Sequence, residues 1–428
     1  MRNTYRYNID SSSDLLMRLL SHSTVIDYMS ILVSNINSNN TYPPDYVEYD
    51  LIAGVDCIED LKSSNDSLLK IRNLHNKRKD WMFGYLSYNL KNELEDLHSS
   101  NEDNIFADHL SFFIPKYVLL LKDKKLEVLT YEKKECVDII LSEIIKPISE
   151  KYNIFLKSRE KKEEYLSKIK KIKKHIQRGD IYEMNYCMEY FSHNVDIAPE
   201  SLFFDLNSKT KTPFSIFLHV HDHYIISASP ERFIRRKNNK LLSQPIKGTI
   251  RRGKNNNEDK LLLNRLVASK KDVSENIMIT DLVRNDLSKT ANKFSVNVDE
   301  LCKVYTFNHV HQMISTISSE VNEEKHFTEI LESIFPMGSM TGAPKIRSME
   351  LIEFYEEFNR NIYSGSAGYI SPDGNFDFNV IIRTIIYNIK ERYISVGVGG
   401  AITINSDPNK EYEECLLKLI PILEVLRK

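Results

Sequence analysis

Hydrophobic and polar residues alternate along this chain with more than one period, and each period predicts a different element. Apolar residues recur at helical spacing from Tyr165 to Ile176 and stop before Gly179, which predicts an amphipathic helix with a glycine at its C-terminal end. A second helical pattern runs from Asp259 to Leu287. Short runs rich in β-branched and aromatic residues predict strands at Phe112 to Leu121, Val304 to Ile317, Ser364 to Ile370, Val380 to Tyr387 and Tyr393 to Val398. From Tyr224 to Ile250 the pattern predicts short strands separated by turns. Because the strands cluster and the helices fall between them irregularly, the pattern favours an α+β fold over a regular βαβ repeat.

The last helix has a distinct beginning. Asp407 can cap it, and Pro408 suits its first turn. Its apolar pattern is continued by Leu416, Leu417, Ile420 and Leu423. We therefore expect a helix that runs nearly to the C-terminus.

A charged and weakly apolar segment from Ser149 to Lys162 is the candidate junction between two regions. The regions are residues 1–150 and residues 160–428, and we expect both to belong to one compact body. The sequence shows no internal repeat with a period of 20–50 residues, so a repeat scaffold is not expected.

Composition excludes several classes of protein. The chain has 58 Lys+Arg and 60 Asp+Glu, a formal net charge of −2, so it lacks the basic surplus that nucleic-acid binding requires. Its N-terminus does not resemble a secretory signal, and no apolar run approaches the length of a membrane helix. The five cysteines are scattered without a CxxC pair, which favours reduced thiols over zinc ligands. We expect a cytoplasmic protein that binds neither nucleic acid nor membrane.

Two glycine-rich stretches suggest a nucleotide site at first sight. In Gly338 to Lys345, Pro344 removes a backbone donor and no Ser or Thr follows the lysine, so the stretch is not a phosphate-binding loop. The other stretch, Gly397 to Ile402, has no third glycine and no helix directly after it. Its paired Gly399 and Gly400 can either let the backbone approach a ligand closely or form a plain turn.

The run LHVHDHY would place His219, His221 and His223 on one face if it formed a strand. A three-histidine zinc site is one interpretation. A solvated strand end is the favoured one, because charged loops adjoin the run and no fourth ligand is in view.

Carboxylates and one lysine are the strongest candidates for chemistry. Glu411, Glu414 and Lys418 share one helical face, which is most simply a solvated salt-bridge surface. If Glu275 of another predicted helix met Glu414, the two could hold Mg²⁺ through hard oxygen ligands. Lys247 stands at a predicted strand-to-loop corner. The nearby cations, Arg251, Arg252 and Lys254, could lower its pKa enough to make it a nucleophile.

From Gly179 onward the chain carries a series of motifs in a fixed order: GDIYEMNY (179–186), SASPERF (227–233), PIKGT (245–249), ENIMITDLVRNDL (275–287), MTGAPKIRSMELI (340–352), YSGSAGYI (363–370), IIRT (381–384), GVGGAI (397–402) and SDPNKEYEECLLK (406–418). This series resembles the chorismate-utilising enzymes, the family of anthranilate synthase component I, aminodeoxychorismate synthase component I and the isochorismate and salicylate synthases. Residues 1–150 resemble the family more loosely, best in GYLSYNLKNELEDL (84–97). The resemblance implies an α+β body in which two antiparallel sheets pack together and helices surround them.

The resemblance also implies a site. Mg²⁺ would lie between Glu275 and Glu414 and bind the ring carboxylate of chorismate, with support from Glu411 and Lys418. The groups implied to hold the carboxylates and hydroxyl of the substrate are Thr341, Gly342, Arg383, Gly399 and Gly400.

Within the family, Lys247 of PIKGT and Thr341 of MTGAPK look like the aminodeoxychorismate synthase branch, where anthranilate synthases usually carry Ala at the lysine position. Lys247 would attack C2 of chorismate, and Glu231, with its pKa raised by burial, would protonate the departing C4 hydroxyl. Ammonia would then enter at C4 and expel the lysine, so that the product is 4-amino-4-deoxychorismate, on the way to 4-aminobenzoate and folate.

The sequence departs from the family pattern at Gln312, which stands where many relatives carry histidine. Glutamine can hydrogen-bond to substrate but cannot exchange a proton at neutral pH. The alternate face of the strand carries His311, which is a poor substitute.

The chain also lacks a glutaminase module, which implies a separate glutamine amidotransferase subunit as the source of ammonia. Tryptophan binding, which some relatives show, stays open. Formation of anthranilate, isochorismate or salicylate is the first alternative, and a non-catalytic chorismate-binding subunit is the second.

Overall fold

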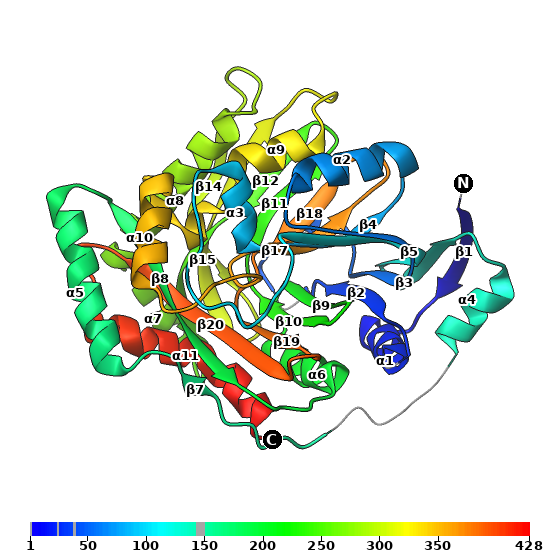
Figure 1. The fold of residues 1–428 in the computed structure, drawn as a ribbon, viewed down its shortest axis with the longest axis horizontal. Coiled ribbons are helices and arrows are strands. Elements are labelled where there is room, and N and C mark those ends of the chain that lie inside the picture. Colours follow the sequence, from blue (N-terminus) through cyan, green and yellow to red (C-terminus); the bar gives the residue numbers. More distant parts are fainter. Residues whose placement is uncertain (1, 24, 37–39, 143–149) are drawn as a thin grey trace.

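A computed structural model describes residues 2–23, 25–36, 40–142 and 150–428. Within them the chain forms an α+β fold (Figure 1). The strands are β1 Asn3–Asn8, β2 Tyr28–Val33, β3 Leu51–Ser63, β4 Met82–Leu86, β5 Leu110–Lys122, β6 Lys125–Thr130, β7 Lys157–Ser158, β8 Glu183–Ser192, β9 Phe214–Val220, β10 His223–Ser229, β11 Arg232–Lys237, β12 Lys240–Gln244, β13 Ile246–Arg251, β14 Asn297–Thr306, β15 Val310–Glu320, β16 Gly342–Ala343, β17 Ser366–Ile370, β18 Phe376–Asn379, β19 Thr384–Asn388 and β20 Tyr393–Ile402. The helices are α1 Ser12–His22, α2 Ser67–Arg78, α3 Lys91–Leu94, α4 Lys134–Leu141, α5 Lys162–Arg178, α6 Pro199–Thr210, α7 Asn256–Val267, α8 Lys270–Ser288, α9 Phe327–Ile334, α10 Lys345–Tyr355 and α11 Pro408–Leu426.

Strand β5 belongs to two sheets at once. One of its edges pairs with β3, while the other pairs first with β4 and then with β6. From β5 one sheet continues through β3, β2, β9, β10, β19 and β20 to β8, and the other continues through β4, β17, β18, β11 and β12 to β15. The paired strands are antiparallel, and buried residues from both sheets share one hydrophobic cluster. The expectation of two packed antiparallel sheets is therefore confirmed, and β5 joins them.

The sequence of β5 explains how one strand serves both sheets. Its run LSFFIPKYVLLLK is buried almost throughout, as expected of a strand that is covered on both faces. In its second half the side chains alternate: Leu119 and Leu121 enter one core, whereas Val118 and Leu120 enter the other. The first core lies between the outer face of the β8–β20 sheet and a set of helices that includes α1, α5, α6 and α11.

The amphipathic pattern before Gly179 forms α5, as predicted. Tyr165, Ile169 and Ile172 are buried, and Gly179 ends the helix with a positive φ of 84°. Helix α11 also begins as predicted, because the side chain of Asp407 accepts hydrogen bonds from the first backbone N–H groups of the helix.

The buried face of α11 differs from the predicted apolar pattern. Cys415, Leu419 and Ile422 pack into the core, whereas Leu417 is 65% exposed and Leu416 and Ile420 are also exposed. The helix packs on β20, α5 and α6, and the direction of these contacts decides which face is covered. Helical spacing alone does not give that direction.

Two predicted segments divide into smaller elements. The helical pattern from Asp259 to Leu287 forms α7 and α8, because the side chain of Ser269 accepts a hydrogen bond from the backbone of Asp272 and starts a new helix. The predicted strand from Val304 to Ile317 forms parts of β14 and β15, which pair as a hairpin.

The histidine run is a hairpin and not a single strand. His219 is the last residue but one of β9 and is buried, His221 lies in the turn with a φ of 53°, and His223 begins β10. His219 stacks on Tyr224, and His223 contacts the carbonyl oxygen of Ile105. The three residues therefore do not share a strand face, and His219 is not at a solvated strand end.

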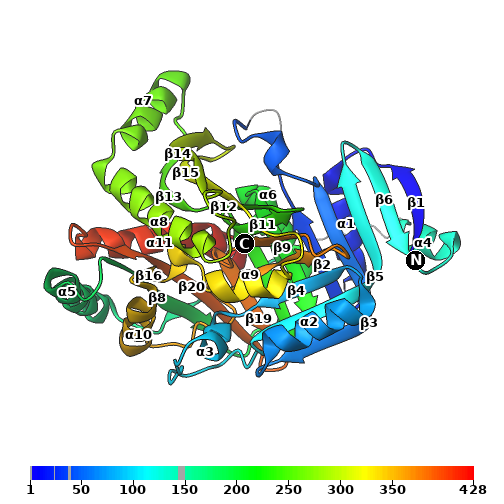
Figure 2. The same cartoon turned by 90° about the horizontal axis from the view of Figure 1, so that it is seen from above.

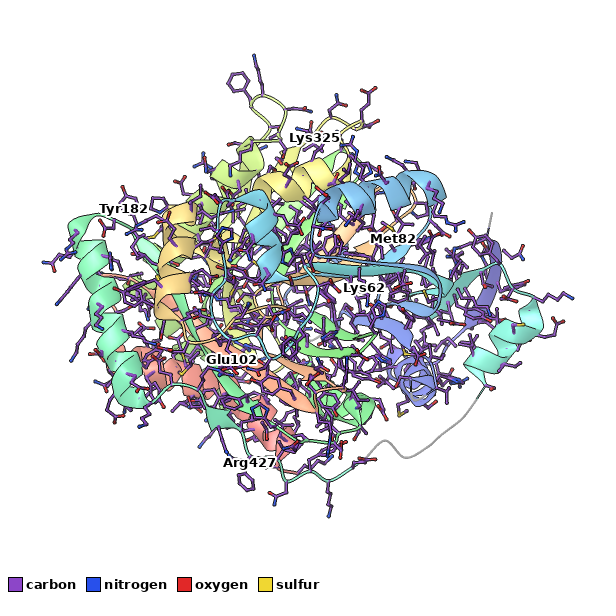
Figure 3. The ribbon with its side chains drawn as sticks, viewed as in Figure 1. Lys62, Met82, Glu102, Tyr182, Lys325 and Arg427 are labelled. Atoms are coloured by element: carbon purple, nitrogen blue, oxygen red, sulfur yellow. The ribbon has the colours of Figure 1, made fainter. Side chains whose placement is uncertain are left out.

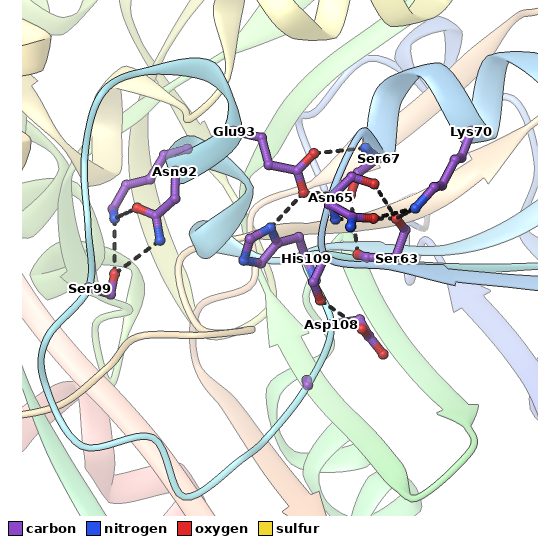
Figure 4. Close-up of polar contacts among 12 residues, drawn as sticks. Ser63, Asn65, Ser67, Lys70, Asn92, Glu93, Ser99, Asp108 and His109 are labelled. Atoms are coloured by element: carbon purple, nitrogen blue, oxygen red, sulfur yellow. Dashed lines mark hydrogen bonds and ion pairs between the residues drawn. The ribbon is translucent and has the colours of Figure 1, made fainter.

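The beginning of α2 is held by a side chain from another element (Figure 4). Asp66 makes no side-chain cap there. Instead, the carboxylate of Glu93 in α3 accepts hydrogen bonds from the backbone N–H of Ser67 at 2.7 Å and from its hydroxyl at 2.6 Å. His109 contacts the same carboxylate. This cluster fixes α2 and α3 to the start of β5.

The predicted junction from Ser149 to Lys162 begins outside the described residues, which resume at 150. Strands from both sides of it are neighbours, since β2 pairs with β9. Figure 2 shows β1, β6 and α4 at one end of the molecule and α5, α7 and α11 toward the other. In the described part of the chain, no helix combines the length and apolarity needed to cross a membrane.

Candidate active site

Lys247 lies in a buried position on β13, surrounded by carboxylates. Its Nζ is 3.2 Å from Oε1 of Glu183 on β8, and the lysine side chain is only 11% exposed. Burial alone would lower the pKa of Lys247, but the negative charges of Glu183, Glu275 and Glu231 outweigh burial and raise it. The lysine is therefore held as an ammonium ion.

The prediction that nearby cations lower the pKa of Lys247 is wrong, because that pKa is raised. Arg251 and Arg252 are paired with Glu258 and Asp259 on α7. Their charges are thereby balanced away from Lys247, and carboxylates are the groups that act on the lysine.

Glu231 lies between β10 and β11 and is 5% exposed. Burial raises the pKa of its carboxyl group to about 7, although a hydrogen bond with Ser339 and the charge of Lys247 oppose the rise. The burial of Glu231 and the upward shift of its pKa agree with the expectation, and its role as general acid stays a prediction. Such a group can donate a proton near neutral pH.

Three carboxylates predicted to bind metal converge on one cation. Nζ of Lys271 lies 2.7 Å from Glu411, 3.8 Å from Glu275 and 3.9 Å from Glu414. Lys418 bonds to Glu414 at 2.9 Å. The face shared by Glu411, Glu414 and Lys418 thus points toward α8 and is not simply a solvated surface.

Carboxylate oxygens are the ligands that hard cations such as Mg²⁺ prefer, so this cluster has suitable ligand atoms. Oε1 of Glu275 is buried without a hydrogen-bond partner, and burial raises the pKa of Glu275 to about 7 against the opposing charges of Lys247 and Lys271. As the side chains stand, no three acidic, histidine or cysteine groups among the described residues meet closely enough for a metal. The ammonium of Lys271 occupies the space between them.

The paired glycines have different surroundings. A Cβ at Gly400 would lie 3.7 Å from both Oε2 of Glu411 and Nζ of Lys418, so this backbone faces the charged cluster. A Cβ at Gly399 would instead collide with Cys187 in the neighbouring strand. The carbonyl oxygen of Gly399 accepts a hydrogen bond from Lys418 at 2.8 Å.

Within the described ranges, Arg383 has no ion-pair partner and Gln312 has one donor without a partner. Among the described residues, no carboxylate lies within ion-pair distance of the guanidinium of Arg383, which faces the charges of Glu231 and Glu414. Nε2 of Gln312 is buried without a partner. His311 contacts Thr306 and Asp259 on the other face of β15, as predicted.

Thr341 and Gly342 position the backbone that pairs with the start of β8. Thr341 is fully buried, and its hydroxyl donates to the carbonyl oxygens of Met337 and Gly338. Gly342 has a φ of 151°, and a Cβ there would collide with the carbonyl of Glu183. This close approach lets β16 pair with the start of β8, where Glu183 lies.

Three residues of the site carry no role in the sequence analysis: Glu183, Lys271 and Ser339. The sequence carries no signal for the burial of Glu183, because β8 is buried from Glu183 to Tyr190 without alternation and the exposed neighbour is the more apolar Tyr182. Figure 3 shows Tyr182 at the edge of the molecule near α5. Glu275 lies four residues from Lys271 on the same helix, but the partners of Glu183 and Ser339 and the other partners of Lys271 lie far away in the sequence.

The fold has relatives of known structure. Anthranilate synthase component I from Streptococcus pneumoniae superimposes with a TM-score of 0.74 at 23% identity, covering 86% of this chain and 90% of that one. This likeness concerns the fold.

Curated sequences and a family model extend the comparison. Aminodeoxychorismate synthase component 1 of Escherichia coli is 38% identical over 268 residues, which are 62% of this chain and 58% of the relative. The protein of the same name from Klebsiella aerogenes is 32% identical over 347 residues, 80% of this chain and 76% of the relative. The chain thus spans little more than half of the Escherichia coli relative. The model of chorismate binding enzymes matches residues 48–424, and the chain belongs to this family.

Proposed function

We propose that this chain is an aminodeoxychorismate synthase component I, which converts chorismate and ammonia to 4-amino-4-deoxychorismate. The observation that carries the proposal is Lys247, an amine with an 11% exposed side chain whose charge interacts with the acid Glu231. Relatives that bear this name support it. The product would serve 4-aminobenzoate and folate biosynthesis.

The side chains of the site suit two successive substitutions on the ring. In the first, the amine of Lys247 attacks C2, the ring double bonds shift, and the C4 hydroxyl leaves with a proton from Glu231. In the second, ammonia attacks C4, the double bonds shift back, and the bond between Nζ and C2 breaks. Glu231 then regains its proton from the incoming nitrogen. In this proposal Arg383 holds a substrate carboxylate, and Gln312 donates a hydrogen bond to the substrate.

Mg²⁺ is the proposed cofactor, with Glu275 and Glu414 as its ligands and Glu411 in support. When bound, it supplies Lewis acidity toward the ring carboxylate. Lys271 has a 39% exposed side chain, so its ammonium can leave the space between the carboxylates without unfolding the helix.

A separate glutamine amidotransferase subunit is the proposed source of ammonia, since relatives are named component 1. The proposed location is the cytoplasm. All five cysteines lie in the described part of the chain and are free, which suits a reducing compartment.

The test incubates the purified chain with chorismate, Mg²⁺ and ammonium, and identifies the product by mass and by its conversion with aminodeoxychorismate lyase. A product that keeps its enolpyruvyl group and yields 4-aminobenzoate supports the proposal. Anthranilate, isochorismate or no turnover contradicts it.

Lys247→Ala is the matched variant, and we expect it to lose amination by at least a hundredfold. The chain with Lys254→Ala, which removes a lysine from the exposed loop after β13, serves as its control and should keep the wild-type rate. Full amination by Lys247→Ala would refute the nucleophile assignment.

A further inference from the structure

Lys247 presents a chemical difficulty for the proposed reaction. Its surroundings hold it as an ammonium ion, and an ammonium nitrogen has no lone pair with which to attack carbon. Before each turnover the lysine must therefore pass one proton to another group. That group has to lie within hydrogen-bond reach of Nζ.

Glu183 meets this requirement. Its Oε1 lies 3.2 Å from Nζ of Lys247, and no other carboxylate among the described residues is within ion-pair distance of that nitrogen. The carboxylate is 1% exposed at its side chain, so bulk water does not compete for the proton. Its other oxygen, Oε2, is buried and has no hydrogen-bond partner in the described structure.

The remaining carboxylates that face Lys247 have other tasks. Glu231 carries the proton needed at C4 and is hydrogen-bonded to Ser339. Glu275 of α8 and Glu414 of α11 belong to the cluster around Lys271. Glu183 alone combines contact with Nζ and an oxygen left without a partner.

We infer that Glu183 is a catalytic base that removes the proton from Lys247 and returns it when the lysine is expelled, an inference that rests on the proposed function. In the first substitution a proton moves from Nζ to Glu183, and the freed electron pair forms the bond to C2. In the second substitution the bond between Nζ and C2 breaks, its electron pair stays on nitrogen, and Glu183 gives the proton back. Glu231 completes an equal cycle at C4, so the net change is chorismate plus ammonia to aminodeoxychorismate plus water.

The backbone fixes Glu183 for this task. Ala343 pairs with Glu183 and Gly342 with Met184, which anchors the first residues of β8. On the other edge, β20 pairs with β8 from Ser192 to Met184. The pairing with β16 holds the backbone of Glu183, and the pairing with β20 starts at the next residue, Met184. These pairings keep Glu183 in place beside Lys247 through both substitutions, as proton transfer in either direction requires.

The test variant is Glu183→Gln, which keeps the size of the side chain and removes its charge. Glu189→Gln is the matched control, because Glu189 is a buried, ion-paired glutamate of the same strand and its partner is Arg159. Two quantities are measured against pH: the rate of amination with chorismate, Mg²⁺ and ammonium, and the rate at which cyanate carbamylates Lys247, followed by peptide mass spectrometry.

The two quantities should change in opposite directions. Without the neighbouring carboxylate the pKa of Lys247 falls, so carbamylation at neutral pH should rise severalfold. Amination should fall by about 10²–10⁴, the contribution of a positioned base, with the KM for chorismate changed less than threefold. Glu189→Gln should change neither.

Each other result has a definite meaning. Amination within threefold of wild type, or a loss equal to that of Glu189→Gln, overturns the inference, as does a decrease of both amination and carbamylation. If the wild-type chain forms no aminodeoxychorismate but Glu183→Gln still accelerates carbamylation, the ion pair exists and the proposed function is what fails.

Discussion

Gly399 and Gly400 are neighbours on β20, yet a methyl group added to each meets different surroundings. At Gly399 the new Cβ would collide with Sγ of Cys187 and lie 2.5 Å from the carbonyl oxygen of Tyr186, a backbone atom that cannot move without shifting β8. At Gly400 the three nearest atoms are 3.7–4.0 Å away and belong to Glu411, Lys418 and Glu414. Gly399→Ala should therefore strain the fold, and Gly400→Ala should only narrow the site.

The magnitudes follow from these contacts. Overpacking costs about 1–3 kcal/mol, and a clash with backbone belongs at the upper end. Unfolding entropy is about 2.1 cal/mol/K per residue, so a loss of about 3 kcal/mol in this chain of 428 residues lowers Tm by about 3 °C. For Gly400→Ala we expect an unchanged Tm. A methyl group in a binding site changes kcat/KM by about ten- to two-hundredfold.

Thermal unfolding and steady-state amination of chorismate with ammonium measure both quantities on the same preparations. We expect Gly399→Ala to lower Tm and Gly400→Ala to lower kcat/KM, although the two positions are adjacent. A drop in Tm for Gly400→Ala equal to that for Gly399→Ala would refute it. An unchanged kcat/KM for Gly400→Ala would show that this backbone does not border the substrate.

Two further predictions concern other glutamates. Because Glu231 has a pKa of about 7 and must be protonated to donate, kcat/KM should fall tenfold per pH unit above about pH 7. Glu231→Gln should abolish this decrease at high pH and lower the rate by about 10²–10⁴. A pH profile of kcat/KM that is flat up to pH 9 contradicts the acid role. Glu93→Ala should cost about 1–2 kcal/mol of unfolding free energy in urea, because α2 loses the cap at Ser67. The exposed neighbour Asp96→Ala is its control, and equal stability of the two variants would contradict the capping role.

Helix ends that depend on residues close by in the sequence could be predicted from the sequence. Gly179 ends α5 because a positive φ is needed there, and Asp407 caps α11 through backbone groups two and three residues away. Such contacts lie within a few residues and are visible in the sequence. The buried face of α11 depends instead on β20, α5 and α6, and the apolar residues Leu416 and Leu417 remain outside.

In the site, too, some features could be predicted from the sequence and others could not. The types of residue at Lys247, Glu231 and the three acidic positions of the α8–α11 cluster were predictable, because the family motifs carry them. The charge state of the lysine was not, since it depends on Glu183, which reaches it from another strand. Lys271 was missed for a similar reason: two of the three carboxylates around its ammonium, Glu411 and Glu414, lie on α11, far away in the sequence.

The pairing of β20 with β8 also sets the order in which the molecule can assemble. Gly400 pairs with Tyr186, so the two sides of this ladder leave the ribosome far apart in time. Contacts between distant parts of a chain form slowly, because a long loop must close before they become favourable. Until β20 arrives, one edge of β8 has unsatisfied backbone groups that can recruit another chain. Nascent or truncated chains that end before β20 should therefore aggregate. The part of the site that β20 carries, at Gly399 and Gly400, is among the last to form.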